Sequence, residues 1–319
     1  MTEIKIHIKF NRYTSHKQLV SDLAPAFIAT KENKVNIQID LNVDKLLYSD
    51  FLILVVAAVT HLRANDIPVS GNIKCNPDND KVKYASRVNF FKLLGLDYKE
   101  KYSRKSSKGK FTELTPYTNE NVDNIFNKIR AILIANVEII IEVQQLLDYC
   151  MYEIMDNVIN HSALPIKYGG KGWCCAQLFP QSNEIRLLIC DTGIGIHQAL
   201  SQHPQSKYKG ISEQEAITLC TQKDVTNGEG MGFGLFATSE FIKLNGGEMT
   251  VYSGNHFSHT AKGQVTISSG MFWQGTFVYL RIYTQNAVDY KKIMPEGHTL
   301  PDDYQFFLEK TFGFNDDLW

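Results

Sequence analysis

Four glycines alternate with other residues between Asn227 and Leu235, directly before an apolar stretch with helical spacing. Glycines leave backbone N–H groups accessible and a helix N-terminus favours anions, so this pattern is typical of a phosphate cradle. No GxxxxGK[ST] pattern occurs, which excludes a Walker A loop. The run also lacks a preceding strand with an acidic residue about 20 positions later, which argues against a dinucleotide-binding turn. A flexible glycine-rich loop is the alternative for this segment alone.

An upstream segment, residues 150–161, predicts a helix with a polar face beside an apolar stripe. Glu153, Asn157 and His161 fall within an arc of about 80°. A carboxylate can act as a general base, and an Asn carbonyl suits Mg²⁺ that is held together with substrate phosphates. A solvated polar helix face is the alternative interpretation of this spacing alone.

Between these segments lies a third one, residues 187–196, in which a buried strand delivers Asp191 to its end. Gly193 and Gly195 follow at once. A carboxylate in that position can accept a hydrogen bond from an exocyclic amine, and the glycines let a flat ring pack close to the backbone. A tight strand-to-loop turn without a ligand is the alternative.

The order and spacing of these three segments resemble the GHKL ATP-binding family, which includes gyrase, Hsp90, histidine kinases, MutL and the anti-sigma serine kinases. The resemblance covers about residues 120–284 and continues through residues 246–253 and 275–280. Glu153 and His161 look most like the anti-sigma kinase version of the first motif. The implied fold is α/β, a Bergerat-type sandwich with a mixed sheet covered by helices.

The resemblance also implies a role for each matching position. Glu153 would be the general base, Asn157 the Mg²⁺ ligand, and Asp191 the partner of the adenine amino group. The remaining expected ATP contacts are His161, Gly193, Gly195, Gly230, Gly232, Gly234, Leu235 and Thr276. Residues 196–229 would form a lid, with phosphate contacts sought among Lys207, Lys209 and Lys223, and Asp156 and Asn160 flank the polar helix face.

The N-terminal residues 1–98 alternate between strand and helix patterns. A strand is predicted at 35–41, a buried helix at 51–63, a strand after Ile67, and an amphipathic helix at 84–94. This order is similar to a STAS domain, in which a serine at the start of the helix is phosphorylated in the anti-anti-sigma members. Here Ser49 is followed by Asp50, which departs from the usual Ser-Gly pair, so a helix N-cap is the favoured role for Ser49.

The net charge of the chain changes sign near residue 118, close to the point where the nucleotide-binding motifs begin. Residues 1–118 carry a net +7 and residues 119–319 a net −8, and the basic excess is concentrated at 99–110. The predicted organisation is a STAS-like domain, a basic linker, a GHKL domain and an acidic tail, at residues 1–98, 99–120, 121–285 and 286–319. A solvated linker is favoured over a nucleic-acid site at 99–110, because Tyr102 is the only tyrosine in that range that is available for stacking.

Other features of the chain favour a bacterial cytoplasmic protein. The longest apolar run, residues 51–59, is about half of what a bilayer-spanning helix needs, and the N-terminus has no apolar signal region. The six cysteines form no zinc-binding pattern and read as structural thiols. We therefore expect no membrane association.

The predicted function is a nucleotide-dependent regulatory switch that binds ATP and Mg²⁺ and has ATPase or protein serine/threonine kinase activity. A module that holds ATP without hydrolysing it and regulates a partner by contact is the alternative. A regulatory partner protein is expected, with a homodimer left open. A sensor histidine kinase is disfavoured, because no phosphoacceptor helix lies upstream.

Overall fold

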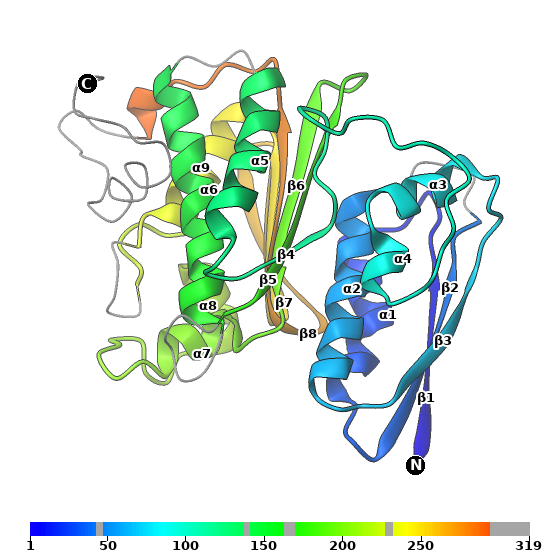
Figure 1. The fold of residues 1–319 in the computed structure, drawn as a ribbon. Helices are drawn as coiled ribbons and strands as arrows, with labels where there is room; N and C mark the ends of the chain where they lie inside the picture. The colour runs from blue at the N-terminus through cyan, green and yellow to red at the C-terminus, as the bar shows by residue number, and fades with distance from the viewer. Residues whose placement is uncertain (43–46, 137–140, 163–169, 227–231, 294–319) are drawn as a thin grey trace.

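The computed structural model describes residues 1–42, 47–136, 141–162, 170–226 and 232–293. Within them, two sheets each pack against helices, and the N-terminal sheet lies at one side of the molecule (Figure 1). The α/β class predicted from the sequence is confirmed. The two sheets differ in direction, because the first is parallel and the second is antiparallel.

The N-terminal region alternates strands with helices, in the order β1 (Thr2–Lys9), α1 (His16–Ile28), β2 (Asn33–Asp40), α2 (Ser49–Ala64) and β3 (Val69–Lys74). The predicted strand at 35–41, the helix at 51–63 and the strand after Ile67 are confirmed. β1 and α1 have no counterpart among the predicted elements, although Ile4, Ile6 and Ile8 alternate with polar residues as a half-buried strand requires.

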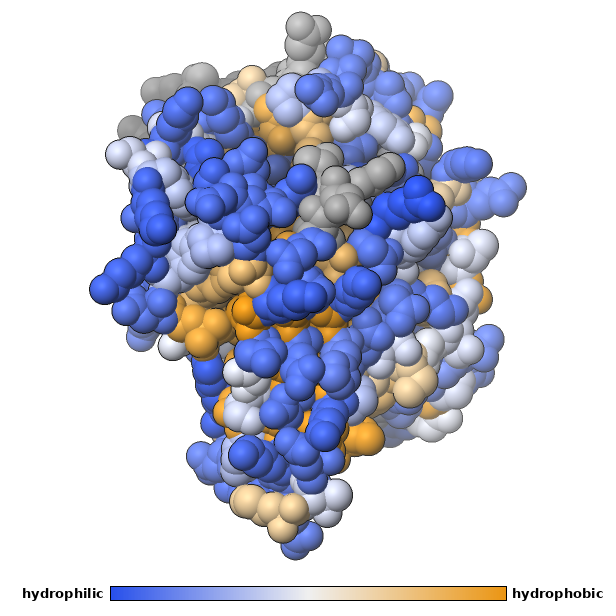
Figure 2. All heavy atoms as spheres, turned by 90° about the vertical axis from the view of Figure 1, so that its right-hand side faces the viewer, coloured by the Kyte–Doolittle hydropathy of each residue, from blue (hydrophilic) through white to orange (hydrophobic). Residues whose placement is uncertain are grey.

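The strand order β1-β2-β3 follows the chain, and both pairings are parallel. Crossovers between parallel strands are nearly always right-handed. When each crossover also leads to the next strand on the same side, both connecting helices lie on the same face of the sheet. Accordingly α1 and α2 lie together on one face, and the other face is open and mainly hydrophilic (Figures 1 and 2). The buried positions Ile6, Ile37 and Ile39 point toward the helices.

The connection between the two sheets is anchored along part of its length. The predicted amphipathic helix at 84–94 is two helices, α3 (Asp80–Arg87) and α4 (Phe90–Leu93), separated by Asn89 with φ +67°. Arg104 contacts Glu100 at 2.7 Å, and Phe111 forms an isolated bridge with Gln177. Lys101, Lys105, Lys108 and Lys110 are exposed, as expected of a solvated basic segment.

The second sheet has the order β4-β5-β6-β8-β7, with each adjacent pair antiparallel rather than mixed. Its strands are β4 (Thr115–Tyr117), β5 (Gly172–Phe179), β6 (Glu184–Asp191), β7 (Glu248–Ala261) and β8 (Gln264–Tyr283). β4 lies within the segment predicted as linker, so the sheet begins before residue 121. Hairpin connections between β5 and β6 and between β7 and β8 account for the antiparallel direction.

The β7–β8 hairpin is longer than the sequence predicts. The sequence pattern predicts separate strands at 264–268 and 276–282, but β8 is continuous through the glycine- and serine-containing stretch between them. Pairing with β7 supports that stretch, with register shifts around Gly254. The turn uses Lys262 and Gly263, both with positive φ, which suits a two-residue hairpin connection.

Helices cover one face of the second sheet and form the layer that the sequence predicted. They are α5 (Val122–Asn136), α6 (Ile141–His161) and α9 (Gly234–Asn245), with α7 (Gly195–Ser201), α8 (Glu213–Leu219) and the short helix η1 (Tyr290–Lys292) at the periphery. α9 ends at Gly246, which adopts the left-handed conformation that is common after the last residue of a helix. Apolar residues of α6 and α9 share one core with alternate residues of β6, β7 and β8.

The opposite face of the second sheet is covered by the N-terminal region. A single apolar cluster joins α1 and α2 to residues of β5, β6 and β8, including Leu188, Trp273 and Phe277. α2 therefore lies between the two sheets, which explains a helix that is apolar nearly all round. In the described part of the chain, no helix combines the length and apolar character needed to cross a membrane.

Candidate functional site

The polar face predicted on residues 150–161 lies on α6. Met151, Ile154, Met155 and Val158 are buried against the sheet, whereas Glu153 and Asn157 are half-buried on the neighbouring face. Glu153 and Asn157 are one helical turn apart, so their side chains project from the same side. His161 is the last residue of α6, and its side chain lies outside the described residues.

The beginning of α9 packs directly on Glu153. A Cβ placed on Gly234 would lie 2.3 Å from Glu153 Cβ and 2.8 Å from its Oε2. Only glycine permits this approach, because real Cβ atoms do not come within 3.0 Å of such neighbours. The Glu153 carboxylate is thereby held beside the first turn of α9, where N–H groups without helical partners favour an anion.

The glycine run that precedes α9 is described only in part. Gly230 lies outside the described residues. Gly232 has φ +63°, and its Cα faces the backbone of Val225 so closely that a Cβ would lie 2.4 Å from the Val225 carbonyl oxygen. Leu235, one residue into α9, packs against the core on the helix side of the sheet. The expected nucleotide contacts of these residues stay predictions.

Asp191 ends β6 and is 4% exposed. Its Oδ1 accepts a hydrogen bond from the Gly193 N–H at 2.7 Å. Burial raises the pKa of Asp191 to about 7, while hydrogen bonds from the backbone N–H groups of Gly193 and Thr276 act in the opposite direction. A buried carboxyl that titrates near neutrality is typical of a functional group.

The loop after Asp191 packs on the end of α6. The Ile194 N–H donates to the Ser162 carbonyl oxygen at 3.1 Å, and a Cβ on Gly193 would lie 1.8 Å from the same oxygen. Gly193 therefore has to be glycine for the loop to reach α6. This contact connects the Asp191 loop to the helix that carries Glu153 and Asn157.

The second glycine of the loop is fixed by the two longest strands. Gly195 has φ +76°, and its neighbour Ile196 donates its N–H to Ser253 Oγ on β7 at 2.9 Å. Ser253 Oγ donates in turn to the Gly275 carbonyl oxygen at 2.8 Å, and Thr276 Oγ1 lies 3.3 Å from Ser253 Oγ. The predicted residues Asp191, Gly195 and Thr276 are thus brought together at one end of the sheet.

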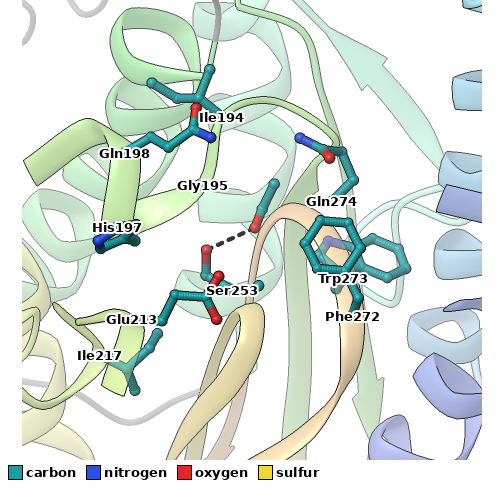
Figure 3. A pocket seen from close by; sticks show the side chains of 12 residues that line it. Ile194, Gly195, His197, Gln198, Glu213, Ile217, Ser253, Phe272, Trp273 and Gln274 are labelled. Atoms are coloured by element: carbon teal, nitrogen blue, oxygen red, sulfur yellow. Dashed lines mark hydrogen bonds between the residues drawn. The ribbon is translucent and has the colours of Figure 1, made fainter. Parts of the chain in front are cut away.

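A pocket opens beside this network, between the starts of α7 and α8 and the two strands of the hairpin (Figure 3). Its lining includes His197, Glu213, Ser253 and Gln274. Glu213 Oε2 accepts a hydrogen bond from the Asn255 N–H at 3.2 Å, which ties the start of α8 to β7. The predicted lid lysines Lys207, Lys209 and Lys223 are exposed in the same region.

The described residues fit a nucleotide with a metal ion. The glycines at 193, 195 and 234 let the Asp191 loop and the start of α9 pack directly on Ser162, Ser253 and Glu153, which brings both loops close to the polar face of α6. Asp191 presents a buried carboxylate near them. Mg²⁺ bound mainly through phosphates needs only one or two oxygen ligands from the protein, and Asn157 supplies an oxygen of that kind.

Comparison with known families agrees with this geometry. Residues 142–290 match the family described as histidine kinase-, DNA gyrase B-, and HSP90-like ATPase. A GHKL-type ATPase domain is therefore found at residues 142–290. The matched range begins in α6 and ends after β8, so it includes Glu153, the Asp191 loop and the start of α9. No curated protein matches the chain.

Several residues of the GHKL domain that shape the loop were not predicted as site residues. The indole Nε1–H of Trp273 donates to the Asp191 carbonyl oxygen at 3.3 Å, and the Gln274 side-chain amide donates to the Gly193 carbonyl oxygen. Side chains of a strand alternate between its two faces, so Trp273 shares a face of β8 with Phe277, and Thr276 lies on the other face. The face on which Trp273 lies could therefore be predicted from the sequence. Its contact with Asp191 could not, because no local pattern indicates it.

The N-terminal region changes one expectation about Ser49. The N-cap of α2 is Tyr48, and Ser49 is the first helical residue, so the predicted N-cap role for Ser49 is wrong. Ser49 is 4% exposed, and its Oγ lies 3.5 Å from Gln177 Oε1 on β5. The STAS-like identity of residues 1–98 stays a prediction.

Proposed function

We propose that the protein is an ATP- and Mg²⁺-dependent regulatory switch that hydrolyses ATP. The observation that carries this proposal is the double contact of α6, which meets the Asp191 loop through Ser162 and the start of α9 through Glu153. One helix thus joins a site suited to adenine to a site suited to phosphates. The ATPase family match over residues 142–290 supports the same assignment.

Recognition of the base rests on Asp191. Its ionised carboxylate can accept a hydrogen bond from the adenine amino group, and Thr276 lies beside it for a contact through water. Gly193 and Gly195 let the loop that follows Asp191 pack closely on Ser162 and Ser253. Since a buried carboxylate without a donor is costly, a base that lacks the amino group should bind more weakly.

Hydrolysis rests on Glu153 and Asn157. Glu153 is positioned to accept a proton from a water that attacks the terminal phosphate, because its carboxylate lies beside the first turn of α9. Asn157 would hold Mg²⁺, which when bound neutralises charge on the phosphate oxygens. The backbone N–H groups at the start of α9 would bind oxygens of the same phosphates.

Regulation rests on the segment between the two glycine-containing loops. α7 and α8 lie in this predicted lid, and Glu213 at the start of α8 contacts both Asn255 and His256 on β7. A change in the lid on ATP binding or hydrolysis would alter these surface contacts and so be readable by a partner protein. A regulatory partner that recognises one lid state is therefore part of the proposal.

Phosphorylation of Ser49 within the same chain is not proposed. Ser49 is buried on the face of the second sheet that the N-terminal region covers, while Glu153 lies on the helices of the opposite face. A serine/threonine kinase reaction would therefore need a hydroxyl other than that of Ser49.

The test uses the full chain with ATP labelled on its terminal phosphate. Release of free phosphate is expected from the protein alone. Label on serine or threonine of an added protein would favour the kinase activity instead. Stabilisation by nucleotide without turnover would favour the non-hydrolysing binding module.

Two substitutions separate binding from hydrolysis. Glu153→Gln should lower turnover by about 100-fold or more while the Kd for ATP changes little, because a general base contributes about 10²–10⁴-fold. Glu240→Gln is the matched control, since this carboxylate pairs with Lys243 on the surface of α9. Turnover that persists in Glu153→Gln would remove Glu153 from the base role.

Asp191→Asn addresses the adenine contact. It should raise the Kd for ATP by about tenfold or more, because hydrogen bonds to charged groups contribute about 1.5–3 kcal/mol. An unchanged Kd would contradict the proposed pocket.

A further inference from the structure

Asp191 is held from both faces of the second sheet. Its carboxylate lies on the helix side, where the N–H groups of Gly193 and Thr276 donate to it. Its backbone carbonyl oxygen accepts the indole N–H of Trp273 at 3.3 Å from the other side. The position of the carboxylate therefore depends on a residue whose ring belongs to the apolar cluster shared with the N-terminal region.

Trp273 belongs to a short stretch of β8 that contacts the Asp191 loop through several consecutive residues. The next residue, Gln274, donates its side-chain amide to the Gly193 carbonyl oxygen. A Cβ on Gly275 would lie 2.4 Å from Asp191 Oδ1, so this glycine is in close contact with the carboxylate. The Thr276 N–H completes the set. Four consecutive residues thus fix the loop that is proposed to bind adenine.

The other side of the Trp273 ring is in contact with the N-terminal region. The ring is fully buried and meets Phe27 of α1 edge-on, with centroids 4.8 Å apart. It also packs on Phe277 at 5.6 Å. In Figure 3, Trp273 lies on the side of β8 that faces the blue ribbons of the N-terminal region. α1 therefore supports the tryptophan that holds Asp191.

We infer that Trp273 is a positioning residue for the adenine-binding carboxylate, and that α1 fixes it through Phe27. The N-terminal region thereby sets how strongly the site selects adenine. This inference rests on the proposed function, because it assigns a determinant of selectivity to the same site. It makes the N-terminal region part of the nucleotide site's structure without a contact to the nucleotide.

The physical basis is the directional bond of the indole. An indole N–H only donates, and the Asp191 carbonyl oxygen is its acceptor. The interior around the ring is tightly packed, so the ring cannot shift without moving its neighbours. Removing the N–H releases one restraint on Asp191, while removing the bulk of Phe27 releases the ring itself.

The first test is Trp273→Phe, which keeps an aromatic ring in the core and removes the N–H donor. Binding is measured for ATP and for purine riboside triphosphate, which lacks the amino group at position 6. We expect the Kd for ATP to rise about five- to tenfold and the Kd for the analogue to change less than twofold. Trp173→Phe is the matched control, since Trp173 is buried on β5 in the same apolar cluster.

A double-mutant cycle with Asp191→Asn isolates the coupling. If Trp273 acts through Asp191, then Trp273→Phe should not further weaken ATP binding in the Asp191→Asn background. Phe27→Leu should reduce the preference for ATP over the analogue in the same direction. Thermal unfolding of each variant verifies that the protein is folded at the assay temperature.

The outcomes separate this inference from the proposed function. Equal weakening of both nucleotides by Trp273→Phe, or additive effects in the cycle, would overturn the positioning role and leave a structural one. If Asp191→Asn removes the preference for ATP while Trp273→Phe preserves it, the adenine site stands and the inference fails. If the unmodified protein shows no preference for ATP over the analogue, the proposed function itself fails.

Discussion

The two faces of the five-stranded sheet carry different chemistry. On the helix side, Asp191, Ser253 and Thr276 form a polar network at one end of the strands, next to the glycine-containing loops. On the other side, Trp273, Phe277 and Tyr279 belong to the apolar cluster shared with the N-terminal region. The same strands therefore supply a candidate nucleotide site on one face and an interface between two regions on the other.

The difference shows how one sheet can carry a candidate binding site on one face and pack against another region with the other face. Side chains of a strand alternate between faces, so a residue and its neighbour belong to different environments. The covered face has its own polar pair, the half-buried His16 and the buried Asp50, whose Nε2 and Oδ2 atoms are 2.9 Å apart. His16 also stacks on Tyr279 with ring centroids 4.3 Å apart. This pair ties α1 and α2 together where both meet the sheet.

The largest effect on stability is expected from a substitution in the His16–Asp50 pair. Asp50→Asn should lower the free energy of unfolding by about 2 kcal/mol, because His16 loses its bond to a carboxylate in a largely buried place, and hydrogen bonds to charged groups contribute about 1.5–3 kcal/mol. Urea denaturation measures the effect. Asp66→Asn is the matched control, since the exposed pair of Asp66 with Lys31 should contribute less than about 0.5 kcal/mol. Equal effects at the two positions would contradict a special role for the covered face.

A smaller effect should appear in the pH dependence of the helix side. Because the pKa of Asp191 is raised to about 7, its ionised fraction rises from about a tenth to about nine tenths between pH 6 and pH 8. The affinity for ATP should therefore rise by up to about tenfold over this range. The affinity of Asp191→Asn for ATP should not show this rise. The pH profile of the variant also serves as the baseline that corrects for the titration of ATP itself. Parallel profiles for the two proteins would show that Asp191 does not titrate there.

The same shift has a consequence for the protein without nucleotide. The native pKa of Asp191 lies above its ordinary value of 3.8, so the native state binds more protons than the unfolded chain between about pH 4 and pH 7. The contribution of this group to stability is present below pH 4 and is lost as the pH rises through 7. Asp191→Asn should accordingly stabilise the protein without nucleotide more at pH 8 than at pH 5.

The smallest effect is expected on the open face of the parallel sheet. Lys74 Nζ lies 3.7 Å from Asp40 Oδ2, and its side chain is 76% exposed. Lys74→Ala should change the free energy of unfolding by less than about 0.5 kcal/mol, as for most exposed ion pairs. A loss of more than about 1 kcal/mol would show that this open face contributes to stability.

Much of the candidate site was predictable from local pattern. The spacing of Glu153 and Asn157, the strand end at Asp191 and the helix start at Gly234 are all where the sequence places them. These features are set by short-range geometry, because helix periodicity and glycine conformations depend on a few neighbouring residues. The STAS-like identity of residues 1–98 and the individual nucleotide contacts stay predictions.

Other features required contacts between distant segments. The continuous β8 depends on its pairing with β7, so the glycine- and serine-containing stretch gave no strand signal of its own. The burial of Ser49 depends on β5, which is more than a hundred residues away in the chain. Trp273 became relevant only when its bond to Asp191 was seen.

The sequence by itself determined that residues 51–59 form an apolar helix and that the Asp191 and Gly234 loops carry chemistry suited to a nucleotide. The tertiary structure decided what that helix covers and which residues hold Asp191 in place. The physical reason is that hydrophobic burial has no direction, so an apolar sequence does not specify its partner. Helix periodicity and glycine conformations, by contrast, are specified by the residues that form them.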